Sequence, residues 1–84
     1  MQTIRALLDR IRWDSEFGKA DFELAFWDRV EQELIRLSLG KIIIVPDDHY
    51  FFHYLDGEGI EHSVPLHRIK AVYRNGERIW HREH

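Results

Sequence analysis

The first dozen residues have the hydrophobic period of an α-helix. Apolar side chains recur at positions i, i+3, i+4 and i+7 between Ile4 and Ile11, which places them along one helical face. Thr3 precedes this stripe and has the side chain of a good N-cap. We therefore predict a helix over residues 3–12 and a loop over residues 15–20.

Alternating apolar and polar residues predict strands along the rest of the chain, because successive side chains of a strand point to opposite faces. Tyr50, Phe52 and Tyr54 are predicted to share one face of such a strand. Pro65 is predicted to open a short helical turn, where its missing N–H does no harm. The predicted strands before the final hairpin are residues 22–26, 34–37, 42–45, 49–54 and 60–64.

The strongest turn signal is the dipeptide Asn75-Gly76 between two strand-like runs. It is typical of a type I′ hairpin, whose two central residues need positive φ. This turn predicts a register in which Val72 faces Ile79, and these two share one side of the hairpin. The residues predicted to lie together on the other side are Tyr73, Arg78, Trp80 and Arg82.

These elements predict an α+β fold, and 84 residues allow a single domain, residues 1–84. One N-terminal helix is expected to pack on a mainly antiparallel sheet of about five to seven short strands. Such a sheet packs one face on the core and can leave the other face free. A free face that carries aromatic and arginine side chains would be a binding surface.

The composition excludes several classes of protein. Twelve basic residues against fifteen acidic ones give a net charge of −3, which excludes a generally basic protein that coats nucleic acid. The chain has no cysteine, so disulfides, thiolate zinc sites and cysteine nucleophiles are excluded. No stretch approaches the ~20 apolar residues of a membrane span. We therefore expect a cytoplasmic protein that needs no cofactor.

Arginine dominates the basic residues, since it accounts for nine of the twelve. Its planar guanidinium suits phosphate and carboxylate better than the ammonium group of lysine does. Arg68 and Arg82 are predicted to clamp one phosphate. The other members of the predicted site, which would contact the phosphate or stack on a base, are His67, Tyr73, Arg78 and Trp80. The alternative that stays open is a core position for the indole and a solvated face for the arginines of the last strand.

Six histidines offer metal and acid–base chemistry. His49 and His53 would share a strand face but lie about 13 Å apart, too far for one metal ion. We therefore expect no metal site. His67 and His81 are candidates for a general base and a general acid acting on a phosphodiester.

Five segments of the chain match a family pattern in their order and spacing. They are residues 10–14 (RIRWD), 26–29 (FWDR), 48–52 (DHYFF), 64–69 (VPLHRI) and 74–82 (RNGERIWHR). The most specific part is the PLHRI run followed by the glycine and the Trp-x-Arg of the last hairpin. Over nearly its whole length the chain resembles the RNA cyclic group end recognition domain family, which consists of small, largely archaeal proteins and modules.

The resemblance implies recognition of RNA ends that carry a 2′,3′-cyclic phosphate or a related phosphate. The residues at the family's motif positions are His67, Arg68, Trp80 and Arg82, with Trp13, Asp28 and Arg29 as secondary candidates. We expect a non-catalytic module whose partner is an RNA 3′ end. A homodimer or an RNA-processing protein partner is a further candidate.

Two alternatives to a binding module stay open. One is an RNA phosphodiesterase that uses His67 and His81. The other is a protein-interaction module whose partner surface is marked by Phe51 and Trp27.

Overall fold

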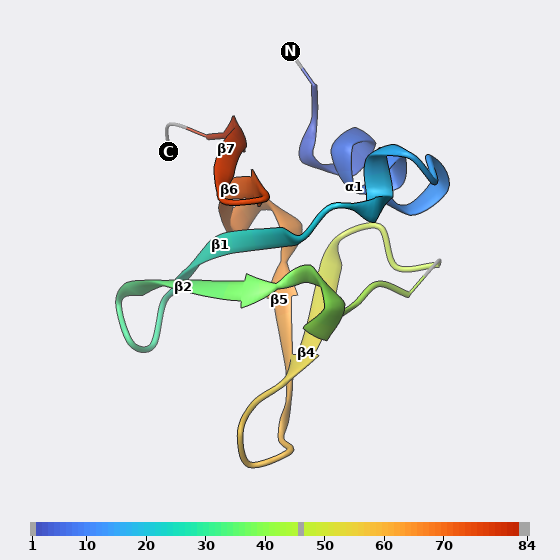
Figure 1. The fold of residues 1–84 in the computed structure, drawn as a ribbon. Helices are drawn as coiled ribbons and strands as arrows, with labels where there is room; N and C mark the ends of the chain where they lie inside the picture. The colour runs from blue at the N-terminus through green and yellow to red at the C-terminus, as the bar shows by residue number, and fades with distance from the viewer. Residues whose placement is uncertain (1, 46, 83–84) are drawn as a thin grey trace.

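The computed structural model describes residues 2–45 and 47–82, which form one α-helix, three 3-10 turns and seven strands in two antiparallel sheets (Figure 1). The predicted α+β class is confirmed. The helical elements are α1 (Ile4–Trp13), η1 (Phe17–Lys19), η2 (Leu39–Lys41) and η3 (Leu66–Arg68). The strands are β1 (Phe22–Asp28), β2 (Glu33–Ser38), β3 (Ile42–Ile43), β4 (Phe51–Leu55), β5 (Glu61–Pro65), β6 (Ile69–Arg74) and β7 (Glu77–His81).

Helix α1 forms where the hydrophobic period predicted it. The Thr3 hydroxyl accepts a hydrogen bond from the Ala6 N–H at 3.0 Å, so it caps the helix as expected. The apolar stripe of Ile4, Leu7 and Leu8 is buried. In the described residues, no helix is long and apolar enough to cross a membrane.

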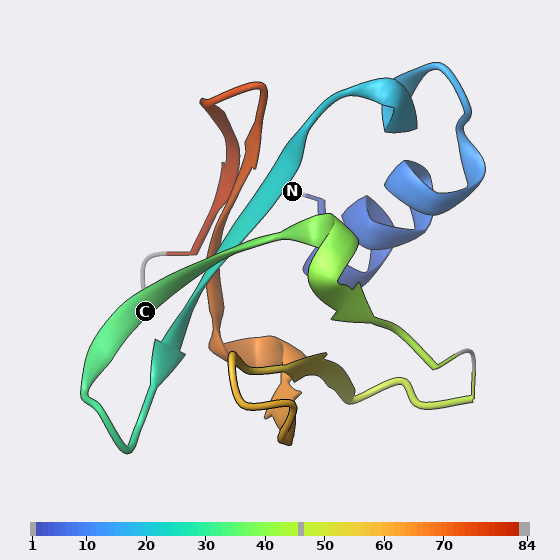
Figure 2. The same cartoon turned by 60° about the horizontal axis from the view of Figure 1, so that its bottom comes forward.

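The larger sheet has the strand order β2-β1-β6-β7. Strand β1 lies in its interior, and its inward-facing residues Phe22, Leu24 and Phe26 are all buried, as their alternation predicted. The smaller sheet has the order β3-β4-β5 and supplies Phe52 and Tyr54 to the core. Figure 2 shows the larger sheet with α1 and the smaller sheet packed beside it.

The prediction of one sheet is wrong, because the chain changes sheets at η3. Pro65 ends β5, and the η3 turn then redirects the backbone so that β6 pairs with β1. A hydrogen bond of 2.8 Å from the Leu66 N–H to the Tyr50 carbonyl holds this turn against the start of β4. The two sheets meet through Phe26, whose ring lies 5.4 Å from the Phe52 ring in an edge-to-face arrangement.

Three local predictions also differ from the structure. The strand predicted over residues 42–45 is limited to Ile42–Ile43. Tyr50 precedes β4 and is 76% exposed, so it does not share the buried face of Phe52 and Tyr54. The segment predicted as a loop over residues 15–20 contains the 3-10 turn η1.

The final hairpin has the predicted turn but a different register. Asn75 and Gly76 both have positive φ, at 50° and 84°, as a type I′ turn requires. A bulge on β7 then shifts the pairing, so Val72 faces Trp80 instead of Ile79. Opposed residues share a face, and the indole of Trp80 therefore packs against the core rather than beside Tyr73.

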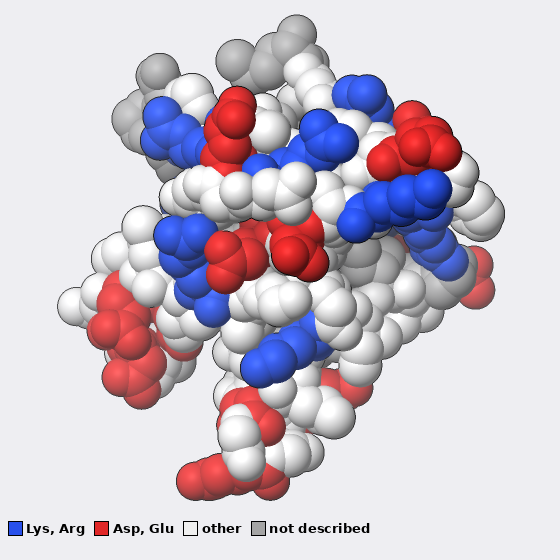
Figure 3. All heavy atoms as spheres, in the orientation of Figure 1, with Lys and Arg blue, Asp and Glu red and all other residues white. Residues whose placement is uncertain are grey.

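Charged side chains of both signs are mixed on the surface. The face drawn in Figure 3 has basic groups next to acidic ones over most of its area. This distribution agrees with the net charge of −3. A binding site for an anion therefore depends on a local arrangement of cations rather than on a broadly basic face.

Candidate functional site

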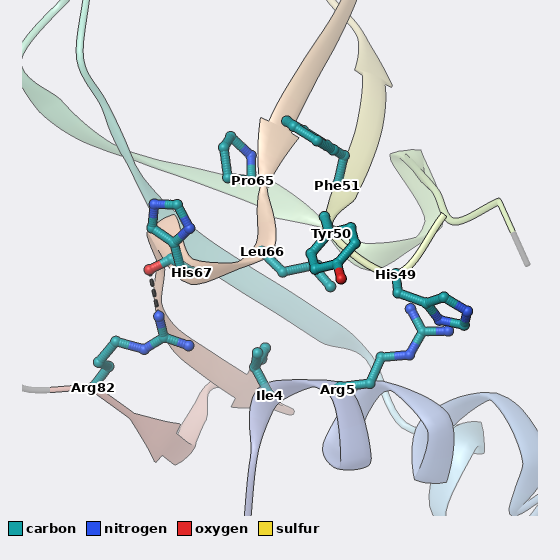
Figure 4. Close-up of a pocket in the computed structure, with 9 residues that line it drawn as sticks. All are labelled: Ile4, Arg5, His49, Tyr50, Phe51, Pro65, Leu66, His67 and Arg82. Carbon is teal, nitrogen blue, oxygen red and sulfur yellow. Dashed lines mark hydrogen bonds between the residues drawn. The ribbon is translucent and has the colours of Figure 1, made fainter. Parts of the chain in front are cut away.

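One surface cavity, which we call the anion cavity, has a volume of about 510 Å³. It lies between the first turn of α1, the segment that leads into β4, and η3 (Figure 4). Its lining residues are Ile4, Arg5, His49, Tyr50, Phe51, Pro65, Leu66, His67 and Arg82. Four separate parts of the chain thus converge on it, because Arg82 comes from the segment after β7.

Arg82 lies at one end of the anion cavity and is held by the backbone around it. Its N–H donates to the Lys70 carbonyl at 2.8 Å, and its Nη1 donates to the His67 carbonyl. The guanidinium carbon lies 5.3 Å from the centre of a Trp80 ring. The Trp80 indole N–H in turn donates to the Gln2 carbonyl at 2.8 Å. These contacts fix the cation beside the exposed His67.

Arg5 lies at the other end of the anion cavity, on α1 (Figure 4). Its Nη1 donates to the Asp48 carbonyl at 3.5 Å, and its Nε lies 3.7 Å from a carboxylate oxygen of Asp9. Both contacts are long for charged groups, so the guanidinium keeps hydrogen-bonding capacity for a ligand. The anion cavity therefore has an arginine at each end.

Asp48 shapes the wall between the two arginines. Its Oδ1 accepts hydrogen bonds of 3.1 Å from the N–H groups of Tyr50 and Phe51, and its Oδ2 lies 3.3 Å from Nε2 of His53. The hydrogen bond from the Tyr50 N–H, assisted by those from Phe51 and His53, lowers the pKa of the Asp48 carboxyl group. The charged carboxylate thus orders the backbone that presents His49, Tyr50 and Phe51.

The rest of the lining is apolar. Ile4 and Leu66 are buried at its base, and Pro65 is half-buried beside them. The exposed rings of Tyr50 and Phe51 stand at the rim. A site with cations at its ends, an apolar base and exposed aromatic rings suits a ligand that joins an anionic group to a flat ring.

The structure brings His67 and Arg82 together but separates Arg68 from Arg82. Adjacent residues of η3 point to different sides, so His67 lines the anion cavity while Arg68 lines a second cavity that includes Asp28. The predicted clamp of Arg68 and Arg82 on one phosphate therefore does not form. The Trp80 indole packs against the core and contacts the Arg82 guanidinium, so it does not form an open stacking surface.

The other predicted site residues lie away from the anion cavity. Tyr73 and Arg78 pair across the final hairpin, and the Arg36 guanidinium lies 4.0 Å above the Tyr73 ring. Trp13 is exposed at the end of α1, and Arg29 is exposed in the turn after β1. None of these four lines it.

The histidines are distributed over several sites. His81 faces Ala71 on β6 and does not line the anion cavity, so the structure does not bring it to His67 there. His53 and His62 contact Asp48 and Asp56. Among residues 2–45 and 47–82, no group of three or more His, Asp or Glu is arranged to hold a metal ion.

Of the nine residues that line the anion cavity, sequence reasoning placed only His67 and Arg82 in the RNA-end site. Arg5 was one charged position beside the helical stripe, and nothing in its local pattern marks it as a ligand-binding residue. His49, Tyr50 and Phe51 belong to one of the five segments that carry the family resemblance, and this was the available signal for them. Contact between these two parts of the chain depends on the fold.

Comparisons with known proteins agree with the resemblance seen in the sequence. The family model of the MJ1316 RNA cyclic group end recognition domain matches residues 1–82. This description indicates RNA-end recognition as the general function. Searches of curated proteins and of solved structures found no significant match. Because the family match covers nearly the whole chain, the protein belongs to the RNA cyclic group end recognition domain family.

Proposed function

We propose that the protein binds RNA 3′ ends that carry a 2′,3′-cyclic phosphate, and that it does so in the anion cavity without catalysis. The observation that supports this proposal is the pair of arginines, Arg5 and Arg82, at the two ends of one partly apolar cavity. A guanidinium donates charge-assisted hydrogen bonds to phosphate oxygens. The terminal base would stack on the exposed ring of Tyr50.

The apolar base of the anion cavity favours a cyclic phosphate over an open one. A cyclic phosphodiester carries one negative charge, whereas a terminal monophosphate carries about 1.5 to 2 at neutral pH. Removing the second charge from water costs free energy that contacts with Ile4, Pro65 and Leu66 do not return. The cyclic end should therefore bind more tightly than the 2′-phosphate or the 3′-phosphate.

The test is a titration of four short RNAs that differ only at the 3′ end. They end in a 2′,3′-cyclic phosphate, a 2′-phosphate, a 3′-phosphate or a hydroxyl, and binding is measured by fluorescence anisotropy. Arg5→Gln and Arg82→Gln should each weaken binding of the cyclic end about 10-fold or more, because a charged hydrogen bond contributes roughly 1.5–3 kcal/mol. Arg12→Gln removes an exposed arginine outside the cavity and is the matched control.

Two results would overturn the proposal. One is equal binding of all four RNAs that neither substitution at the cavity changes. The other is conversion of the cyclic end to an open phosphate during incubation with the wild-type protein, which would replace binding by the alternative of an end-processing enzyme.

A further inference from the structure

A second cavity, which we call the base cavity, lies on the other side of η3 and shares no lining residue with the anion cavity. It is formed where the end of β1 meets β4, β5 and η3, and its volume is about 140 Å³. Its lining residues are Phe26, Trp27, Asp28, Val30, Tyr54, His62, Ser63, Val64 and Arg68. Sites for whole drug-sized ligands start at about 300 Å³, so this volume suits one small ring system.

Aromatic rings build the walls of the base cavity. The rings of Tyr54 and His62 are stacked, with centres 4.9 Å apart and planes 16° apart, and the Phe26 ring lies 5.6 Å from that of Tyr54. A hydrogen bond of 2.7 Å between His62 Nε2 and Asp56 Oδ2 holds the imidazole in place. The walls are therefore ordered before any ligand arrives, and their aromatic rings suit a flat heteroaromatic guest.

Two side chains of opposite charge provide the polar groups. Oδ1 of Asp28 accepts hydrogen bonds from the N–H groups of Val30 and Glu31 at 2.8 and 3.2 Å, which orients the carboxylate and leaves Oδ2 available. The Arg68 side chain is half-buried, and no hydrogen bond or ion pair joins it to the part of the chain that the structure describes. The base cavity thus combines an acceptor from β1 with a donor fork from η3.

We propose that the base cavity binds a nucleobase of the RNA and prefers guanine. Guanine has O6 and N7 side by side, which matches the donor fork of Arg68, and this is the commonest bidentate contact of arginine with a base. On its other edge, N1–H and the 2-amino group are adjacent donors for the carboxylate of Asp28. Adenine has an amino group where guanine has O6, so it would present a donor to Arg68. The proposal rests on the proposed function only in taking RNA as the ligand.

The experiment compares the four ribonucleoside 5′-monophosphates, with inorganic phosphate alone as the control for the anion. Affinities and sites are read from NMR shifts of the labelled protein, with the Trp27 amide reporting on the base cavity and the Trp80 indole on the anion cavity. Guanosine monophosphate should bind roughly fivefold or more tightly than the other three, because one bidentate base contact gives about 1–3 kcal/mol of discrimination. Its largest shifts should occur around Trp27 and Arg68.

Three variants make the test specific. Asp28→Asn keeps an oxygen for the N–H groups of Val30 and Glu31 but loses the charge, and Arg68→Gln loses the fork. Each should abolish the preference for guanine. Arg12→Gln should leave it unchanged, since Arg12 is exposed and lines neither cavity.

The outcomes separate this inference from the proposed function. Equal affinity for the four nucleotides would overturn the proposal that the base cavity prefers guanine. A guanine preference that survives both Asp28→Asn and Arg68→Gln would overturn it as well. The dependence of cyclic-end binding on Arg5 and Arg82 would then still support the anion cavity. If cyclic-end binding did not depend on Arg5 and Arg82 but guanosine monophosphate still shifted the Trp27 signal, only the proposal that the anion cavity binds the cyclic end would be overturned.

Discussion

Asp48 shows how one side chain can order the wall of a cavity that it does not itself line. Its carboxylate accepts two backbone hydrogen bonds and contacts His53, whose Nδ1 lies 2.9 Å from the Ser63 hydroxyl. This network ties the segment before β4 to β5. The neighbouring rings of Tyr50 and Phe51 therefore depend on the ionised form of Asp48 for their position.

The lowered pKa of Asp48 predicts a loss of stability in acid. A group whose pKa is lower in the folded state stabilises that state above its unfolded pKa, about 3.9, and the contribution disappears as the pH falls through the lower folded value. Thermal melts of the wild type below about pH 4 should show this loss, together with that of Asp56, whose pKa is lowered chiefly by its hydrogen bond with His62.

The matched variants are Asp48→Asn and Asp47→Asn. In Asp48→Asn the fall of the melting temperature between neutral and acidic pH should be smaller, because this variant has no carboxylate to protonate. Asp47 is exposed, and its substitution should leave the acid dependence of the wild type in place. Identical acid profiles for Asp48→Asn and the wild type would contradict this account of the wall.

At the residue scale, the sequence predicted part of the anion cavity for sound reasons. His67 and Arg82 stand next to a proline turn and at the end of a hairpin, and both elements form, although the register of the hairpin differs from the prediction. The prediction that Arg68 joins Arg82 on one phosphate was wrong, because neighbouring residues of a 3-10 turn point in different directions. Arg68 therefore lines the base cavity. Side-chain direction in so short a turn is set by packing and is not visible in spacing.

At the element scale, the packing of α1 on η1 depends on a close approach at Gly18. A Cβ atom at this position would collide with the Ile11 carbonyl oxygen, and that atom belongs to backbone. The Gly18 N–H also donates to the Asp14 carbonyl at 2.8 Å, which closes the turn after the helix. The helix and the turn are therefore positioned by the absence of a side chain.

Gly18→Ala should destabilise the protein by about 1–3 kcal/mol, the usual cost of forcing extra volume into a packed site. Urea unfolding measures the change. Gly57→Ala is the control, because a Cβ atom there meets nothing within 4 Å, and its free energy of unfolding should stay near that of the wild type. Similar effects of the two substitutions would show that the α1–η1 contact is looser than it appears.

The final hairpin shows the limit of turn-based prediction. Asn75 and Gly76 have the expected positive φ, and the first two pairs after the turn, Arg74 with Glu77 and Tyr73 with Arg78, fit the register in which Val72 would face Ile79. The register then changes because a bulge inserts one residue on β7. This extra residue turns Trp80 to the core side, where its indole N–H reaches the Gln2 carbonyl.

At the scale of the whole molecule, the charge balance separates capture of an RNA end from binding along an RNA. The protein has a net charge of −3, and each end of the anion cavity has one arginine. A long RNA brings many phosphates that would meet acidic as well as basic groups. We therefore expect only one or two phosphates to be neutralised in the complex.

The salt dependence of binding tests this expectation. For single strands each neutralised phosphate contributes about 0.7 to the slope of log Kd against log salt, so the slope should be about 0.7–1.4. The affinity for a short cyclic-ended RNA should then fall roughly three- to sevenfold between about 50 and 200 mM salt. Lengthening the RNA on its 5′ side should not change the slope, and a slope above about 3 would indicate binding along the backbone instead.

Local order was readable from the chain because it depends on neighbours a few residues apart. The capped helix, the alternation in β1 and the Asn75-Gly76 turn each follow from interactions of that range. The division into two sheets, the bulge in β7 and the convergence on the anion cavity were decided in three dimensions. They depend on contacts such as Arg5 with Asp48 and Trp80 with Gln2, which join positions 43 and 78 residues apart. The spacing of residues along the chain allows many contacts between distant positions, and the close packing of the folded chain selects the few that form.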